Sequence, residues 1–150
     1  MVLFILVLGF FSEYFEFRLN HHMFTKEPYN RMESIGFRKF VMFEKSLWRL
    51  YKEAYLNSIN GYLVIADSMG KNYISFTVLT PSRNIVQFQL PPKYRELGLI
   101  TNKAGILVLI PAQSYWTPGI SSIQEILHLL TTSMSSYGFN ASQDLKLYEG

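Results

Sequence analysis

The spacing of hydrophobic residues along the chain predicts a long helix over residues 37–58. This segment contains neither glycine nor proline, and its apolar residues recur every three or four positions. On a helical wheel one side collects Phe40, Phe43, Leu47, Leu50, Tyr51 and Ala54. The opposite side carries Arg38, Lys45, Arg49 and Lys52. We expect an amphipathic helix that ends at Asn60-Gly61, where glycine can take the left-handed conformation of a C-cap.

After this segment the pattern changes to short runs that are typical of strands. Residues 62–66, 73–80 and 85–90 are rich in β-branched and aromatic side chains and partly alternate in polarity. The connections are short and carry turn residues, which leaves no room for crossover helices. The three runs are therefore predicted to pair antiparallel as a meander, and Pro91-Pro92 ends the third because proline has no N–H to donate.

A fourth strand and a second helix complete the predicted domain. Residues 105–110 form a fully apolar run, as expected of a buried strand. Residues 120–130 place apolar side chains at helical spacing, and Ser121 or Ser122 is expected to cap the start of this helix. The predicted fold class is α+β, with a helix, a four-stranded antiparallel meander and a C-terminal helix.

The amino-terminal residues differ from the rest of the chain. Met1 to Phe11 is a continuous apolar run, shorter than the ~20 residues that a membrane-spanning helix needs. It also lacks the basic region and the clear cleavage site of a signal peptide. Three interpretations stay open: an element packed on this domain or on a neighbour, a shallow membrane anchor, and an unprocessed targeting segment.

Between this run and the predicted domain, turn-forming residues indicate a linker. Residues 23–36 include Pro28, Asn30 and Gly36 among charged residues. We therefore divide the chain into an apolar arm with a linker, residues 1–36, and a compact domain, residues 37–150. Several large apolar residues then fall outside the domain: Tyr14, Phe15, Phe17, Met23, Phe24 and Tyr29. Such residues favour a protein partner that covers them.

Composition narrows the chemistry. A chain of 150 residues that is 49% hydrophobic can bury the core of one compact domain. The chain has no cysteine, which excludes disulfides, cysteine-bound metals and thioester intermediates. Its net charge of +3 comes from scattered side chains, so we predict no nucleic-acid partner. No phosphate loop, nucleophile elbow or zinc-protease motif occurs, and His21, His22 and His128 do not make a metal set, so no cofactor, metal or enzymatic activity is predicted.

One stretch resembles the active-site region of ubiquitin-conjugating enzymes. In that family a glycine precedes the catalytic cysteine, and a W-S-P tripeptide follows the cysteine after eight positions. Here Gly105 precedes Val108, and Trp116-Thr117-Pro118 begins eight positions beyond Val108. Weaker similarities lie at Leu90 to Tyr94 (the family's F-P-x-x-Y-P), at Arg49 to Glu53 (R-L-x-K-E) and at Asn140 to Glu149. The resemblance covers about Phe37 to Glu149.

The resemblance implies a ubiquitin-conjugating fold that has lost its chemistry. Val108 occupies the cysteine position, and the family's His-Pro-Asn tripeptide would fall near Gly98-Leu99-Ile100. Gly105, Trp116 and Pro118 would then be structural. Cysteine-free variants of the family and fused-toes-type proteins work as non-catalytic partners, so we expect an adaptor or scaffold subunit that contacts other protein subunits, with ubiquitin or an active conjugating enzyme among the candidates.

The alternative function is an accessory subunit of a membrane or organellar complex, such as a mitochondrial one, with no link to ubiquitin. It rests on Met1 to Phe11, which would provide the membrane contact. In either case an intracellular protein is expected. The candidate partner-binding residues are Phe11, Tyr14, Phe15, Phe17, Arg38, Lys45, Arg49 and Lys52. For the four basic residues, a merely solvated helix face is the other interpretation.

Overall fold

The fold is α+β, with one six-stranded antiparallel sheet and helices against it. The structure is a computed structural model. It describes residues 2–43, 51–70, 72–81, 92–94, 97–112, 115 and 117–149. The helical elements are α1 (Val2–Phe24), η1 (Tyr29–Ile35), η2 (Pro92–Tyr94), α2 (Ile120–Ser136) and α3 (Lys146–Glu149). The strands are β1 (Arg38–Phe43), β2 (Tyr51–Ile59), β3 (Tyr62–Met69), β4 (Tyr73–Leu79), β5 (Gly98–Thr101) and β6 (Gly105–Pro111).

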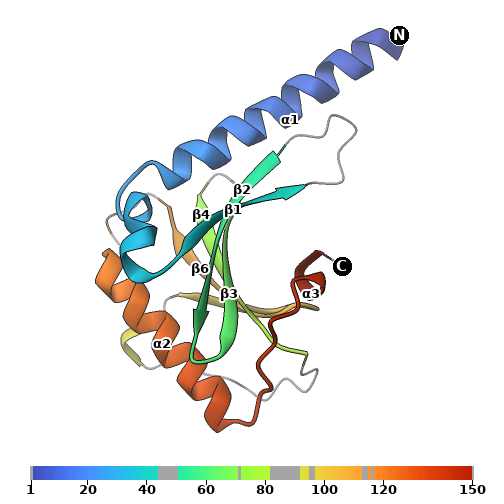
Figure 1. Ribbon diagram of the computed structural model, residues 1–150. Helices are drawn as coiled ribbons and strands as arrows, with labels where there is room; N and C mark the ends of the chain where they lie inside the picture. The colour runs from blue at the N-terminus through green and yellow to red at the C-terminus, as the bar shows by residue number, and fades with distance from the viewer. Residues whose placement is uncertain are drawn as a thin grey trace.

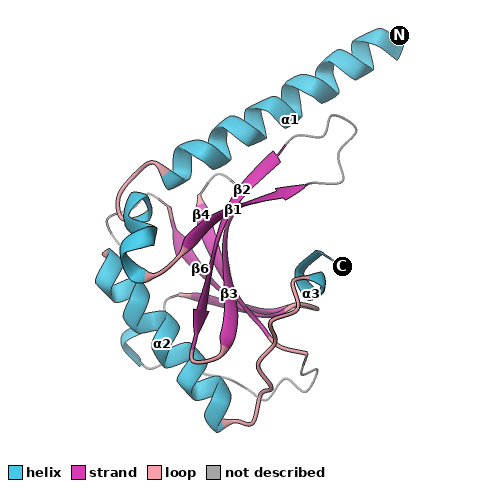
Figure 2. Cartoon of the chain, viewed as in Figure 1, coloured by secondary structure: helices cyan, strands magenta, loops and turns pink. Residues whose placement is uncertain are grey.

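The order of the strands across the sheet is β1-β2-β3-β4-β6-β5, and every neighbouring pair is antiparallel. Figure 1 shows α2 and η1 on one side of this sheet and the C-terminal segment on the other. The same layers are clear in Figure 2, where helices flank the strands. The strands β3, β4 and β6 therefore lie at the centre of a three-layered domain.

Cover on both faces explains why the central strands read as continuous apolar runs. The first core contains alternate residues of the strands, such as Val64, Phe76 and Val108, packed with Ile126 and Leu130 of α2. The second, smaller core lies on the other face: Ala54, Leu63, Ile65, Leu79 and Ala104, with Leu145 and Tyr148 against it. Because successive side chains of a strand point to opposite faces, a strand between two cores needs apolar residues at consecutive positions.

The predicted helix over residues 37–58 is wrong. Residues 38–43 and 51–59 are the strands β1 and β2, which pair from Arg38 with Leu56 to Phe43 with Tyr51. The predicted cap at Asn60-Gly61 is instead the turn between β2 and β3, and both residues have positive φ, 51° and 84°. Two positive φ values match a tight hairpin turn, which Asn-Gly favours. Pairing on both edges of β2 thus outweighs the helical spacing of its apolar residues.

Other elements follow the prediction. The runs at 62–66 and 73–80 are β3 and β4, and 105–110 is β6. The second helix is confirmed, and it continues past Leu130 to Ser136. Its N-cap is Gly119, with no side-chain cap, so the cap assigned to Ser121 or Ser122 is wrong. The four-stranded meander is also wrong, because the sheet has six strands; the predicted strand at 85–90 lies outside the described residues.

The segment interpreted as a linker packs into the first core. Met23, Phe24, Tyr29 and Met32 are all buried there. The Tyr29 hydroxyl donates a hydrogen bond to the carbonyl of Pro111 at the end of β6, 2.8 Å away. Burial of this hydroxyl raises the pKa of Tyr29. The expectation that Met23, Phe24 and Tyr29 await a partner is therefore wrong, since the chain's own sheet and α2 cover them.

Residues 139–149 close the second face of the sheet. The N–H of Leu63 donates to the carbonyl of Ser142, and the hydroxyl of Thr80 donates to the carbonyl of Asn140. The Tyr148 hydroxyl donates to the carboxylate of buried Asp67, 2.9 Å away. Burial, reinforced by the charge of Asp67, raises the pKa of Tyr148. Asp67 and Tyr148 thus anchor the tail in place.

Removing this anchor is expected to destabilise the protein. Tyr148→Phe keeps the ring in the second core but takes a donor away from a buried carboxylate, which costs about 1–3 kcal/mol of the free energy of unfolding. Urea unfolding followed by circular dichroism measures the loss. Tyr115→Phe is the matched control, because the Tyr115 side chain is fully exposed, and it should change stability by less than about 0.5 kcal/mol. Equal stabilities for the two variants would contradict a structural role of the hydroxyl.

Candidate functional site

The strongest candidate for a functional surface is the outward side of α1. Figure 1 shows α1 extending beyond the sheet, with the N-terminus at its far end. Six large apolar side chains on it are exposed and together form what we call the α1 apolar face: Val7, Leu8, Phe10, Phe11, Tyr14 and Phe15. Phe11 is 52% and Phe15 62% exposed. Apolar surface gathered in this way is typical of an interaction site.

Contacts within the helix order these rings. Phe10 stacks on Tyr14 with ring centroids 6.3 Å apart, and it meets Phe11 edge to face at 6.2 Å. The guanidinium of Arg18 lies over the ring of Tyr14, 5.8 Å from its centroid. Aromatic side chains that are held by such contacts lose little conformational freedom when a partner binds. The face is thus partly preorganised.

The other end of α1 is fixed to the body of the protein. Phe24 is buried and packs on Tyr55 of β2, with ring centroids 4.9 Å apart. Near it, Glu53 of β2 accepts hydrogen bonds from His21 of α1 at 2.8 Å and from Lys39 of β1 at 2.9 Å. One carboxylate therefore joins the helix to both strands of the first hairpin.

The neighbours of Glu53 change the pKa of its carboxyl group. Partial burial alone would raise the pKa of this carboxyl, but hydrogen bonds from Lys39 and His21, together with their charges, outweigh it and lower the pKa of Glu53. The pKa of Lys39 is raised, chiefly by the same hydrogen bond. An acid whose pKa is lower in the folded state contributes stability above its unfolded pKa, and that contribution is lost as the pH falls through the folded pKa.

We expect Glu53→Gln to weaken the attachment of α1 in a pH-dependent way. At pH 7 the variant should be less stable than the native protein by about 1 kcal/mol. The difference should shrink as the pH falls below the usual carboxyl range, because native Glu53 then also becomes neutral. Urea unfolding between pH 3 and pH 7 measures it. A stability difference that is the same across this range would contradict the role of the charge.

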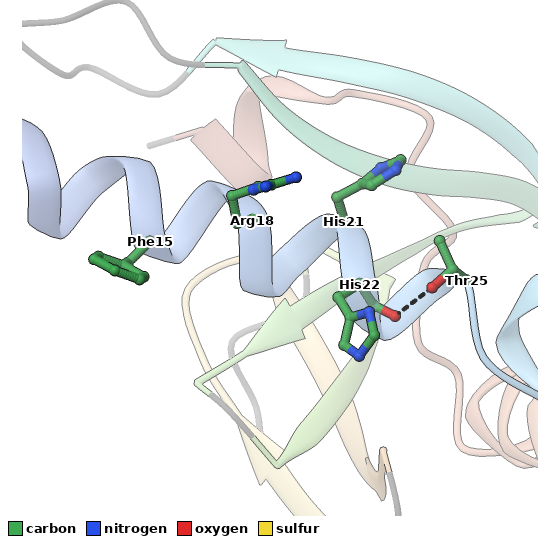
Figure 3. A pocket seen from close by; sticks show the side chains of 5 residues that line it. All are labelled: Phe15, Arg18, His21, His22 and Thr25. Carbon is green, nitrogen blue, oxygen red and sulfur yellow. Dashed lines mark hydrogen bonds between the residues drawn. The ribbon is translucent and has the colours of Figure 1, made fainter.

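A hollow of about 310 Å³ lies on α1 next to the apolar face. Five side chains line it: Phe15, Arg18, His21, His22 and Thr25. Figure 3 shows these side chains along the C-terminal half of the helix, with His21 turned toward the neighbouring strand. The Thr25 hydroxyl donates to the carbonyl of His22. The hollow therefore combines an aromatic ring with a permanent cation.

The predicted partner-binding residues are not all in one place. Phe11, Tyr14 and Phe15 belong to the α1 apolar face, and Arg38 is exposed in β1. Phe17 and Lys52 lie in α1 and β2, but their side chains are outside the described part of the structure, as are Lys45 and Arg49 as a whole. Because residues 38 and 52 belong to paired strands, the basic helical stripe that was predicted does not exist in the described residues.

The residues that carry the family resemblance have structural positions. Val108 is fully buried in the middle of β6, between Phe76 of β4 and Leu99 of β5. Gly105 begins β6, and Pro118 lies half-buried just before α2. Trp116 is outside the described residues. A side chain at position 108 thus faces the first core, where no large substrate can reach it.

Asn102, close to the expected His-Pro-Asn position, has a local role that was not predicted. Its side-chain oxygen accepts hydrogen bonds from the N–H groups of Ala104 and Gly105, at 2.9 and 3.0 Å. These bonds shape the turn between β5 and β6, as asparagine does in many turns. The signal was present in the sequence as Asn followed by Gly three positions later.

The described residues contain neither a metal-binding cluster nor a membrane-spanning helix. No three His, Asp or Glu side chains come close enough together to hold a metal ion. His21 binds Glu53, and His128 is exposed on α2. Among the helices of the described part, none is both long enough and apolar enough to cross a membrane.

Neither the protein-family models, nor the curated proteins, nor the solved structures include one that matches this chain.

Proposed function

We propose that this protein is a non-catalytic adaptor or scaffold subunit, and that α1 is the element by which it docks on another protein. The observation that carries the proposal is the α1 apolar face, whose rings are exposed on a helix that extends from the body. A lone domain gains nothing from ordering such a surface in water, whereas a partner that covers it gains the hydrophobic free energy of burial.

The attachment of α1 supports the same proposal. Met23 and Phe24 are buried in the first core, and Glu53 holds His21. The C-terminal end of α1 is therefore fixed against the sheet by packing and by a hydrogen bond. An adaptor needs this property, because it must keep one partner in a defined place relative to another.

The link to ubiquitin is the more specific form of the proposal. It rests on the resemblance around Gly105, Val108 and Trp116 in the sequence. In this form the protein binds ubiquitin or an active conjugating enzyme and transfers nothing itself. Titration with labelled ubiquitin, followed by NMR, tests it: shifts at sub-millimolar concentration support the link, and their absence removes ubiquitin while leaving the adaptor proposal intact.

The adaptor proposal is tested by purifying the tagged full-length protein from its native cells and identifying what accompanies it. The matched comparison is a variant with Phe11→Ser and Phe15→Ser, both on the α1 apolar face and far from the core. We expect its partners to be lost, while Val41→Ser, an exposed apolar residue of β1, keeps them. Identical sets of partners for all three proteins would refute docking through α1.

The second candidate is an accessory subunit of a membrane or organellar complex. It is favoured by the apolar sequence of α1 from Val2 to Phe11, with exposed Val7 and Leu8. Flotation of the full-length protein with lipid vesicles distinguishes the two candidates. Flotation that is lost on Leu8→Ser and Phe11→Ser would support the membrane candidate, and protein that remains at the bottom would exclude it.

A further inference from the structure

We propose that the partner of α1 is a second copy of this chain, and that two α1 helices pair antiparallel across a two-fold axis near residues 14 and 15. This inference deepens the proposed function and rests on it. It depends on a relation between the two halves of the helix: the α1 apolar face and the hollow around Arg18 lie on the same side, one after the other.

The spacing of the residues shows that they share a side. Along α1 a three-and-four spacing joins apolar residues to residues of the hollow: Leu8, Phe11, Phe15, Arg18 and His22, with Thr25 directly after the helix. Such residues lie on one face of an α-helix. Met23 and Phe24, which are buried in the protein's own core, point elsewhere. A second helix can therefore approach this face without meeting the body to which α1 is attached.

The two halves are complementary in chemistry. The N-terminal half offers apolar rings, and the C-terminal half offers a hollow of about 310 Å³ with an aromatic wall and a guanidinium. Phe11 belongs to the first half, and Arg18 lines the hollow of the second. A phenyl ring placed on a guanidinium gains both apolar burial and a cation–π contact. Each half is thus suited to receive the other half of an identical helix.

Only the antiparallel arrangement brings unlike halves together. If Phe11 of one copy faces Arg18 of the other, the relation holds in both directions, and the axis lies midway, between Tyr14 and Phe15. This is the self-complementary contact that closes a dimer. A parallel pair would instead place the guanidinium of Arg18 beside that of the other Arg18. Like charges so placed repel each other, so the parallel pair is disfavoured.

Cross-linking through single cysteines tests the arrangement. Because the chain has no cysteine of its own, each variant carries a single thiol. In the proposed register Val7 of one copy lies opposite His22 of the other. A mixture of Val7→Cys and His22→Cys proteins should form a mixed disulfide under mild oxidation. Neither protein alone should, because two copies of residue 7 would be separated by 15 residues of helix, about 22 Å, and a disulfide needs Cα atoms within about 7 Å.

The controls separate this geometry from collision. Val7→Cys mixed with Tyr115→Cys, whose side chain is fully exposed and does not belong to α1, reports random encounters and should give little mixed product. Efficient disulfide formation by Val7→Cys alone would show a parallel pair and overturn the proposal. So would equal yields for the two mixtures.

A charge exchange tests the central contact. Phe11→Lys places two cations opposite each other and should weaken self-association at least about tenfold in sedimentation equilibrium. Arg18→Glu added to it, giving F11K/R18E, restores opposite charges across the axis and should recover much of the association. Circular dichroism checks that each variant is folded. Failure of the double variant to recover, with the fold intact, would overturn the pairing of these two positions.

The possible outcomes distinguish a failure of the dimer from a failure of the adaptor function. A native chain that stays monomeric up to roughly 100 µM, with no mixed disulfide, overturns the dimer. If that monomer still binds another protein through Phe11 and Phe15, the proposed adaptor function stands without the dimer. If it instead floats with vesicles of neutral phospholipid, a lipid surface replaces the second copy. A dimer that accompanies no other protein confirms the pairing and refutes the adaptor.

Discussion

Gly105→Ala is expected to be the most damaging single-methyl substitution in this protein. Gly105 begins β6 opposite Leu79 of β4, with φ at 156°. A Cβ atom there would lie 2.0 Å from the carbonyl oxygen of Val78 and 3.0 Å from the nitrogen of Thr80. Val78 belongs to β4 and Thr80 follows that strand directly, so neither backbone atom can move aside without disturbing the pairing of β4 with β6. We expect a loss of at least about 4 kcal/mol, a large part of the stability of a typical domain.

Urea unfolding followed by circular dichroism measures this loss, or the amount of folded protein does where the variant fails to fold. Gly119→Ala is the matched control, because no atom lies within 4 Å of the added methyl and φ is −66°. Since Gly119 is the N-cap of α2, alanine there should cost no more than about 1 kcal/mol. Similar midpoints for the two variants would mean that β6 does not approach β4 as described.

The second large effect concerns Val108→Cys. Cysteine is close to valine in size and favours buried positions, so the variant should fold. Val108 is completely buried in β6, so its thiol should react with an aromatic disulfide reagent only when the sheet opens. We expect the reaction to be at least about 10³-fold slower than that of Tyr115→Cys, given the usual stability of a domain. In 8 M urea the two thiols should react alike.

The same measurement tests whether position 108 could correspond to the active-site cysteine of a ubiquitin-conjugating enzyme. In a ubiquitin-conjugating enzyme the cysteine must be open to a large substrate, and a thioester requires a reactive thiolate. If position 108 is the interior of the sheet, then Val108→Cys accepts no ubiquitin from an activating enzyme even though the cysteine is restored. Rapid modification of native Val108→Cys would show that β6 is exposed at this point, and it would return position 108 to consideration as a former active site.

The parts of the fold that could be predicted are those with local causes. The runs that became β3 and β4 contribute to both cores, and the run that became β6 is buried along most of its length, so their strand character is visible without knowledge of their neighbours. In α2, burial of Ile123, Ile126, Leu127 and Leu130 follows the spacing of a helix with one covered side. In each of these elements, the spacing of apolar residues in the sequence matches the burial of their side chains.

The first hairpin could not be predicted by the same means. The apolar residues of this segment have the spacing of a helix. The segment also contains good helix formers, such as Glu53 and Ala54. The decisive signal is Asn60-Gly61, but the same pair also suits the end of a helix. Two positive φ values at a two-residue turn fix β2 against β3, after which β1 has an edge to join. The strand character of residues 38–59 is thus a consequence of tertiary pairing.

The candidate site was predicted in part. Exposure of Phe11, Tyr14 and Phe15 followed from the number of apolar rings near the N-terminus. The attachment of α1 did not, because His21 and Glu53 are 32 residues apart and no local pattern connects them. The same holds for Tyr29 and Pro111, 82 residues apart. Contacts of this range depend on the complete arrangement of the sheet, which sequence patterns do not contain.

The cover on the second face of the sheet has a consequence for synthesis of the protein. Leu63 and Asp67 of β3 form hydrogen bonds with Ser142 and Tyr148, which the ribosome makes about 80 residues later. Until then, a nascent chain that has already paired β3 with β4 presents Leu63, Ile65 and Leu79 to the solvent. During that interval the growing chain offers a chaperone the surface that its own tail will later cover.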